Sequence, residues 1–456
     1  MKRATGQSER LNSQHADLLI LGGVVMTPNG AEQVDIASSC GVIVALGDLK
    51  GRWQADNVIN AQGLHVLPGV IDSQVHFREP GLSHKEDIES GSRGAVLGGV
   101  TGFFEMPNTD PLTLWDTDLQ AKLDAAEAKA WCDYAFYMGG SAVNAEQLGR
   151  LENLPGCAGV KVFMGSSFGD LLADEDKVLR NILSHGHRRM AVHAEDEARL
   201  IDRKSIVEVS GNVCQHHEWR DVESALKATQ RIVALAEESG RRLHLLHVST
   251  ADEMRFLARH KRHVTVEVTP HHLSMVAPDC YKTLGSLAQM NPPIRELEHQ
   301  EALWEGIQNG TVDVIGSDHA PHTLEEKLRP YPQSPSGMTG VQTLLPLMLN
   351  HLHEGRLTLQ RLVDLTSAGP ARIFGITGKG RIALGFDADL TLVDLNAQRI
   401  ISNEWIASRS GWTPYHGKKI RGWPIHTVVR GKVIVRDEVL VGEPQGKAMA
   451  FLEVVD

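Results

Sequence analysis

Residues 67–77 read LPGVIDSQVHF, and residues 312–322 read VDVIGSDHAPH. Each segment begins with a short apolar, β-branched run and ends in residues that bind metals or move protons. Six more segments of this kind lie between them: VTGFFEMPN (100–108), CDYAFYMGG (132–140), GVKVFMG (159–165), RMAVHAED (189–196), RLHLLHVST (242–250) and VTVEVTPHH (264–272). Such runs are typical of buried strands.

Amphipathic stretches separate the predicted strands. Four are long enough for full helices: 119–130, 221–240, 251–262 and 299–310. Eight strands that alternate with helices predict a closed parallel (β/α)8 TIM barrel with right-handed crossovers. An open doubly wound sheet is the competing arrangement, and the count of eight favours closure.

Both flanks differ from this pattern. Residues 16–65 and 380–441 read as short strands separated by turn residues. We therefore predict one small, discontinuous, sandwich-like β domain from residues 1–65 and 370–456, with the barrel inserted as residues 66–369. The Pro- and Gly-rich segment 323–340 is a candidate loop over the barrel mouth.

Composition narrows the class of protein. The 456 residues are 42% hydrophobic and 23% charged, as in ordinary globular proteins, and the net charge of −11 argues against nucleic-acid binding. No apolar run is long enough for a membrane span, and the polar opening segment 1–15 does not resemble a signal peptide. Five scattered cysteines without a C-x-x-C pair indicate a reducing compartment, so we expect a cytoplasmic location.

The ends of the predicted strands carry the chemistry, because barrel active sites form at the carboxyl ends of the strands. Alternation places Gln74, His76 and Arg78 on one face of the first strand. His193, His247 and Asp318 end three other strands. A single histidine at such a position is usually structural, but imidazoles and a carboxylate from separate strands predict a zinc or other divalent-metal site. His185, His187, His244, His271 and His272 are interpreted as structural or solvated.

Lys161, in the fourth strand, needs a separate explanation because an ammonium group repels metal ions. Burial lowers the pKa of a lysine. The neutral amine can then capture carbon dioxide and become a carbamate, N6-carboxylated Lys161, which can bridge two metals.

Taken together, D-x-Q-x-H-x-R-x-P-G, E-M-P-N-T (105–109), G-V-K-V-F, V-H-A-E, H-V-S, S-D-H-A-P-H and G-R-I-A-L-G-F-D-A-D-L (380–390) resemble the dihydroorotases of the amidohydrolase superfamily. The resemblance runs from about residue 16 to 445. It implies reversible cyclisation of N-carbamoyl-L-aspartate to dihydroorotate in pyrimidine biosynthesis. It also implies one or two Zn²⁺ ions, with Asp318 as the catalytic acid–base group.

The resemblance further implies a substrate-binding set of Arg78, Asn108, Asn291 and His322. A guanidinium group beside amide and imidazole donors would hold the carboxylate of an anionic ring. Allantoinases and dihydropyrimidinases share several of the motifs but generally lack an arginine at the position of Arg78. They remain the alternative activities within the same chemistry.

One residue departs from the family pattern. Strand one usually carries H-x-H, and here Gln74 replaces the first histidine. Three readings follow: Gln74 coordinates through its carbonyl oxygen, the enzyme works with one metal, or the chain is an inactive homologue. An inactive homologue would scaffold a partner such as aspartate transcarbamoylase. We also expect a homo-oligomer, a dimer or a tetramer.

Overall fold

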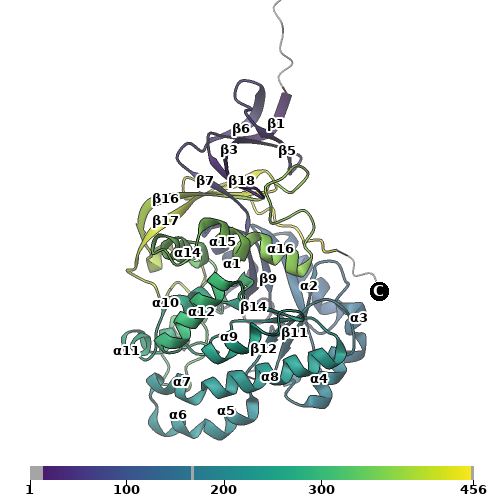
Figure 1. The fold of residues 1–456 in the computed structure, drawn as a ribbon, viewed down its shortest axis with the longest axis vertical. Helices are drawn as coiled ribbons and strands as arrows, with labels where there is room; N and C mark the ends of the chain where they lie inside the picture. Colours follow the sequence, from purple (N-terminus) through teal and green to yellow (C-terminus); the bar gives the residue numbers. More distant parts are fainter. Residues whose placement is uncertain (1–13, 166–168, 453–456) are drawn as a thin grey trace, which may run out of the picture.

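The computed structural model describes residues 14–165 and 169–452. Figure 1 shows a β-rich part, formed by purple N-terminal and yellow C-terminal segments, above a larger part in which helices surround parallel strands. The opening segment 1–15 is not expected to be a signal peptide. Its first thirteen residues lie outside the described residues. Within the described ranges, no helix is both long and apolar enough to cross a bilayer.

The larger part is the predicted barrel. Its eight parallel strands follow chain order around the sheet: β8 (Val70–Val75), β9 (Val100–Glu105), β10 (Asp133–Gly139), β11 (Cys157–Phe163), β12 (Met190–His193), β13 (Leu243–Leu245), β14 (Val264–Val268) and β15 (Val314–Ile315). A parallel bridge between Val75 and His319 joins the last segment to the first, and the N–H of His76 donates to the carbonyl of His319 at 2.7 Å. The prediction of a closed barrel is confirmed.

Helices fill the crossovers. The longest is α8 (Val222–Ser239), which begins at the Asp221 N-cap and ends at Gly240 in a left-handed conformation. Because the cap and the glycine flank the amphipathic pattern, the predicted range 221–240 is close to the observed one. The other barrel-side α-helices are α1 (Ile88–Leu97), α2 (Asp116–Glu127), α3 (Leu148–Leu151), α4 (Asp176–Leu183), α5 (Glu197–Arg203), α6 (Ser205–Ser210), α7 (His216–Trp219), α9 (Ala251–Leu257), α10 (Pro270–Ser274), α11 (Asp279–Leu284), α12 (Leu297–Asn309), α13 (Leu324–Lys327), α14 (Leu344–His353), α15 (Leu359–Val363) and α16 (Gly369–Phe374).

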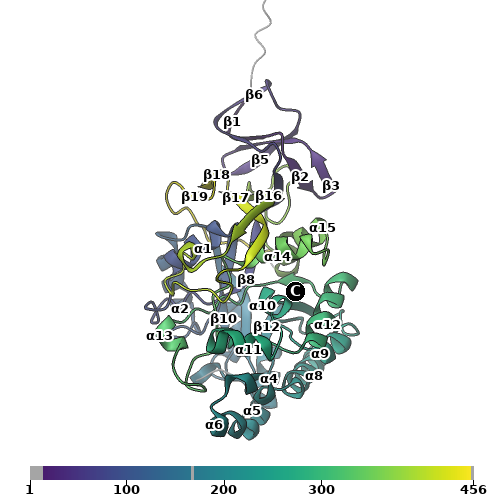
Figure 2. The same cartoon turned by 90° about the vertical axis from the view of Figure 1, so that its left-hand side faces the viewer.

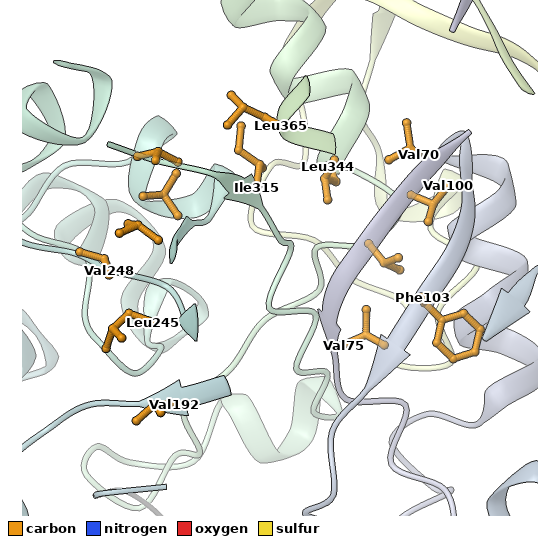
Figure 3. Packing of buried hydrophobic residues seen from close by; sticks show 14 of the residues in the cluster. Val70, Val75, Val100, Phe103, Val192, Leu245, Val248, Ile315, Leu344 and Leu365 are labelled. Carbon is orange, nitrogen blue, oxygen red and sulfur yellow. The ribbon is translucent and has the colours of Figure 1, made fainter. Parts of the chain in front are cut away.

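The apolar side chains of the strands pack against these helices. Figure 3 shows Val70, Val100 and Phe103 from β8 and β9 on one side of the barrel, with Leu344 of α14 nearby. All four are fully buried. This packing fixes the strand positions and leaves the polar residues at the strand ends to form a site.

The smaller part contains two sheets from the chain termini, which lie away from α5 and α6 in Figure 2. The four-stranded sheet has the order β5 (Val42–Gly47), β4 (Asp35–Ser39), β1 (Gln14–Leu21) and β6 (Trp53–Asn60). The seven-stranded sheet has the order β19 (Val439–Leu440), β18 (Lys432–Arg436), β17 (Lys419–Val429), β16 (Leu390–Ile400), β7 (His65–Pro68), β2 (Val24–Thr27) and β3 (Gly30–Gln33). Antiparallel pairing of β16 with β7 joins the two termini in one sheet. An extra β domain built from both flanks therefore accompanies the barrel, and the boundaries at 65/66 and 369/370 stay a prediction.

Candidate active site

Strand β8 ends at Val75, so His76 and Arg78 belong to the following loop rather than to a continued strand. The expectation that simple alternation carries Arg78 along the same face is wrong at this point. Arg78 has a φ of 64°, a left-handed conformation that redirects its side chain. The loop still brings the two side chains toward the carboxyl end of the last strand, where His76 contacts Asp318 and Arg78 contacts Pro321.

The first group of polar side chains centres on Asp318, which is itself strained at φ 49°. Gln74 Nε2 donates to Asp318 Oδ1 at 3.0 Å, and His76 Nε2 lies 3.4 Å from the same oxygen. The other ring nitrogen of His76, Nδ1, is 2.8 Å from Asn108 Oδ1. Asn108 therefore orients His76 in this structure, and its contact with the substrate stays a prediction.

The second group joins β12 to β13. His193 Nδ1 lies 3.1 Å from His247 Nε2, and His193 Nε2 lies 2.9 Å from Glu195 Oε2. Arg220 donates from Nε to Glu195 Oε1 at 3.1 Å and also pairs with Oε2. Burial lowers the pKa of both histidines, although the Glu195 carboxylate opposes this shift at His193. The imidazoles are thus held neutral, the form in which they bind metals.

Glu195 is a site residue that the sequence reasoning missed. Its side chain is fully buried, and the charge of Arg220 together with the His193 hydrogen bond outweighs burial and holds its pKa well below the usual range. A carboxylate that accepts from one ring nitrogen fixes the orientation of the other. The V-H-A-E motif contained the signal, because Glu195 lies two residues after His193 and shares its alternation.

Lys161 on β11 lies in the field of Asp318, and its charge also acts on both His193 and His247. Its Nζ has no hydrogen-bond partner among the described residues and lies 4.1 Å from the centre of the Phe163 ring. Burial lowers the pKa of this lysine to about 7, against the opposing effect of Asp318 and Glu267. A substantial fraction of the amine is therefore neutral at neutral pH.

These side chains fit a divalent metal ion. Besides Lys161 Nζ, two more buried polar atoms, Gln74 Oε1 and His247 Nδ1, lack a hydrogen-bond partner among the described residues. Unpaired buried polar atoms are costly, and here they accompany imidazole and carboxylate groups, which are ordinary metal donors. The donor chemistry of Gln74, His76, Lys161, His193, His247 and Asp318 suits a metal. Among the described residues, however, the His and Asp donor atoms of this set do not meet within 4.8 Å of one another as the carboxylates of Asp133, Asp387 and Asp389 do.

A cationic group lies beside Asp318. Arg78 Nη2 is 3.3 Å from His322 Nε2, and Arg78 Nε donates to the carbonyl of Pro321 at 3.2 Å. Lys85 Nζ lies 3.1 Å from His322 Nδ1. Burial, with the charges of Arg78 and Lys85, holds the pKa of His322 well below its ordinary value. The predicted pair of Arg78 and His322 is therefore adjacent, and Lys85 joins it.

Asn291, the remaining predicted substrate residue, lies in a different hydrogen-bond group. Its Oδ1 is 3.1 Å from His216 Nε2, and the other nitrogen of His216 is 2.9 Å from the Tyr331 hydroxyl. Tyr331 belongs to segment 323–340, the predicted loop over the mouth. The structure thus links Asn291 to that segment rather than to Arg78.

Two further acids, Glu267 and Asp72, are fully buried in the barrel. Burial raises the pKa of Glu267 to about 8 and that of Asp72 to about 7. Ser73 Oγ donates to Glu267 Oε2 at 2.5 Å, and the N–H of Ser317 donates to Asp72 at 2.9 Å. Glu267 therefore stays largely protonated at neutral pH, whereas Asp72 is protonated only in part. The sequence reasoning did not single out either acid.

A separate acidic cluster consists of Asp133, Asp387 and Asp389, whose oxygens lie close enough to hold a metal ion. Lys379 Nζ already lies 2.6, 2.8 and 2.5 Å from these three carboxylates. Asp133 begins β10, so the cluster is at the end of the barrel opposite to the site. We interpret it as an ion network between the barrel and the terminal sheet.

The histidines interpreted as structural have protein partners. His244 Nδ1 lies 2.9 Å from Thr265 Oγ1, His271 Nδ1 lies 2.9 Å from the Tyr415 hydroxyl, and His272 Nε2 lies 3.1 Å from the carbonyl of Pro292. His185 and His187 precede β12, away from the carboxyl ends of the strands. The described cysteines are all free thiols.

Comparison with known proteins agrees with this geometry. The model of the amidohydrolase family matches residues 65–434. A dihydroorotase of Methanosarcina mazei is 34% identical over 440 residues, covering 93% of this chain and 95% of that protein. An allantoinase of Rubrobacter xylanophilus is 35% identical over 450 residues, covering 94% of this chain and 97% of that protein.

Solved structures give the same picture. The L-hydantoinase (dihydropyrimidinase) of Arthrobacter aurescens superposes with a TM-score of 0.90 at 28% identity, covering 95% of this chain and 99% of that one. The dihydropyrimidinase of Brevibacillus agri gives a TM-score of 0.87 at 29% identity, covering 94% and 97%. All four relatives are named for the hydrolysis or formation of cyclic amides. The chain belongs to the amidohydrolase family, and it is a hydrolase that acts on cyclic amides.

Proposed function

We propose that the chain is a metal-dependent dihydroorotase, which interconverts N-carbamoyl-L-aspartate and dihydroorotate. The observation that carries the proposal is the adjacency of Arg78 and His322, 3.3 Å apart beside the Asp318 group. Dihydroorotate carries a ring carboxylate, whereas allantoin and dihydrouracil carry none. A guanidinium beside an imidazole is a receptor for such a carboxylate.

The proposed metal ligands are His76, His193, His247, Asp318 and Lys161, with Gln74 contributing its amide oxygen. When bound, the metal would polarise the scissile carbonyl and acidify water. Lys161 would act as a carbamate: the neutral amine forms an N–C bond to carbon dioxide and releases one proton. The pKa of Lys161 near 7 supports this step.

Asp318 performs the proton transfer in this proposal. In the hydrolytic direction its carboxylate accepts the proton of the attacking water and passes it to the departing ring nitrogen. Arg78 and His322 hold the ring so that the carbonyl lies at attack distance. Ring closure consumes one proton, because carbamoyl-aspartate has two carboxylates and dihydroorotate has one. Cyclisation is therefore favoured at low pH.

A panel of cyclic amides tests the proposal. The purified enzyme is assayed with dihydroorotate, allantoin and dihydrouracil, with elemental analysis alongside and Asp318→Asn as the inactive control. We expect turnover of dihydroorotate, and an Arg78→Met variant with kcat/KM lower by about 100-fold or more, the cost of removing one partner from a buried charged contact. An equilibrium ratio that does not change with pH would contradict the assignment.

Allantoinase is the second candidate, because the Rubrobacter xylanophilus allantoinase is as similar to this chain as the dihydroorotases are. Turnover of allantoin without turnover of dihydroorotate would establish it. Gln74 supports a third outcome, an inactive scaffold, which requires an absence of metal and of turnover together with a tight complex with aspartate transcarbamoylase.

A further inference from the structure

Lys85 contacts His322, one of the two residues of the proposed carboxylate receptor. Its Nζ lies 3.1 Å from His322 Nδ1 and 3.2 Å from Glu326 Oε1, and its side chain is 13% exposed. The other oxygen of Glu326 accepts from the N–H of Thr323 at 3.1 Å, within the capping box that begins α13. Lys85 is thus held between the helix start and the imidazole of His322.

This contact determines the protonation of His322. Glu326 Oε2 also lies 3.8 Å from Nδ1 of His322, but Lys85 Nζ is nearer at 3.1 Å. An ammonium group has three donors and no acceptor, so at this distance Nδ1 presents its lone pair to Lys85. A neutral imidazole with a lone pair on Nδ1 carries its hydrogen on Nε2. The carbonyl of Ser336 lies 3.0 Å from Nε2, as expected for an acceptor of that hydrogen.

Because Nε2 of His322 carries a hydrogen, its contact with Arg78 is not a hydrogen bond. A guanidinium has only donors, so Arg78 Nη2 and His322 Nε2 are two donors placed 3.3 Å apart. They cannot bond to each other. An anionic oxygen beside both would accept from Arg78 Nη2 and share the single Nε2 hydrogen of His322 with the carbonyl of Ser336. This is the geometry of a carboxylate site, and it exists only for one tautomer of His322.

We propose that Lys85 is a positioning residue that holds His322 in the Nε2–H tautomer and thereby makes Arg78 and His322 a receptor for the substrate carboxylate. The inference rests on the proposed function for the identity of the carboxylate. Lys85 acts through His322 and need not touch the substrate. Its loss should weaken binding of carboxylate-bearing rings and leave the chemical step nearly unchanged.

The first test measures the tautomer directly. Long-range ¹H–¹⁵N correlation spectra of histidine-labelled protein report which ring nitrogen is protonated, and His322→Gln identifies the His322 signal. We expect an unprotonated Nδ1 in the wild type and a shift toward the Nδ1–H form in Lys85→Met, with Lys85→Gln as a second variant should Lys85→Met not fold. Lys85→Arg, another pure donor, should keep the wild-type tautomer.

The second test separates KM from kcat. Lys85→Met should raise KM for dihydroorotate by about tenfold or more, the loss expected for a charge-assisted hydrogen bond, with kcat within about twofold. KM for any carboxylate-free cyclic amide that the enzyme accepts should not change. Lys282→Met is the matched control, because Lys282 pairs with Asp279 on the surface far from these residues in the chain.

Each outcome of the two tests supports or overturns the proposed role of Lys85. A protonated Nδ1 in the wild type overturns the proposal, as does a Lys85→Met variant in which either the tautomer or KM for dihydroorotate is unchanged. If the wild type binds dihydroorotate without turnover, the proposed function fails alone, and its dissociation constant replaces KM in the comparison. If the wild type does not bind dihydroorotate, both proposals fail.

Discussion

Gln74 Nε2 donates to Asp318 Oδ1 across 3.0 Å, and this bond joins the first strand of the barrel to the last. The bond uses the amide N–H, so the carbonyl oxygen Oε1 is left buried and without a partner among the described residues. The amide is therefore oriented with its only possible metal-binding atom away from the carboxylate. Gln74 occupies the position of a ligand without having the affinity of an imidazole.

Replacing Gln74 by histidine should restore a stronger ligand. We expect Gln74→His to bind more metal per chain than the wild type, as measured by elemental analysis after dialysis. Gln74→Ala is the control and should bind no more than the wild type. Unchanged activity in a Gln74→His variant with extra metal would mean that one metal suffices, whereas unchanged metal content would contradict the ligand assignment.

Lys161→Ala should lose metal and activity, and short carboxylic acids such as acetate should restore part of both by replacing the carbamate. In the wild type, the fraction of Lys161 in the reactive neutral form increases as pH rises through about 7, the pKa set by burial. Reconstitution of the metal-free enzyme with metal and bicarbonate should therefore be slower at pH 6 than at pH 8. A rate independent of both pH and bicarbonate would exclude the carbamate.

Glu195→Gln should weaken metal binding by about 10- to 100-fold, the usual effect of removing a carboxylate that orients a metal-binding histidine. The glutamine can still contact His193 but no longer neutralises Arg220, which is nearly fully buried. Metal affinity is measured by competition with a chelator. The matched control is Glu237→Gln, which removes a surface carboxylate paired with His260. Equal affinities in both variants would contradict the role of Glu195.

Glu267 predicts a pH dependence of stability in the metal-free protein. Burial raises its folded-state pKa to about 8, so the folded protein holds a proton that the unfolded chain releases above about pH 4.3. This contribution makes the free energy of unfolding fall as pH rises from about 4.3 to 8.

Glu267→Gln keeps an acceptor for Ser73 and removes the titration. Thermal unfolding of the variant should show a flatter decline between pH 5 and 8 than the wild type, and equal slopes would contradict the assignment. Because the folded-state pKa of Lys161 is lowered, its contribution to stability rises above pH 7 and is separable from that of Glu267.

Sequence patterns were sufficient for the barrel because each strand is short, apolar and followed by a crossover helix. They overestimated strand length where polar groups interrupt the backbone pairing. Residues 312–322 were expected as one strand, yet β15 spans only Val314–Ile315. The N–H of Ser317 donates to the side chain of Asp72 rather than to a neighbouring strand, and Asp318 adopts a positive φ.

The candidate site was predictable to the extent that its residues lie at strand ends. Asp318, His193 and His247 follow directly from that rule. Lys85 and Glu195 did not, because their roles depend on contacts with His322 and His193 that only the folded loops create. Asn291 was placed near the substrate by a motif alone. The structure pairs it with His216, and its contact with the substrate stays a prediction.

The pairing of β7 with β16 has a consequence for synthesis on the ribosome. Strand β7 leaves the exit tunnel before any barrel strand and pairs on one edge with the earlier strand β2. Its partner on the other edge, β16, begins only after more than 300 further residues, at Leu390. The nascent chain must therefore carry an exposed β edge while the whole barrel is translated. Early release at residue 380 would leave that edge permanently open, a template for aggregation rather than for a working enzyme.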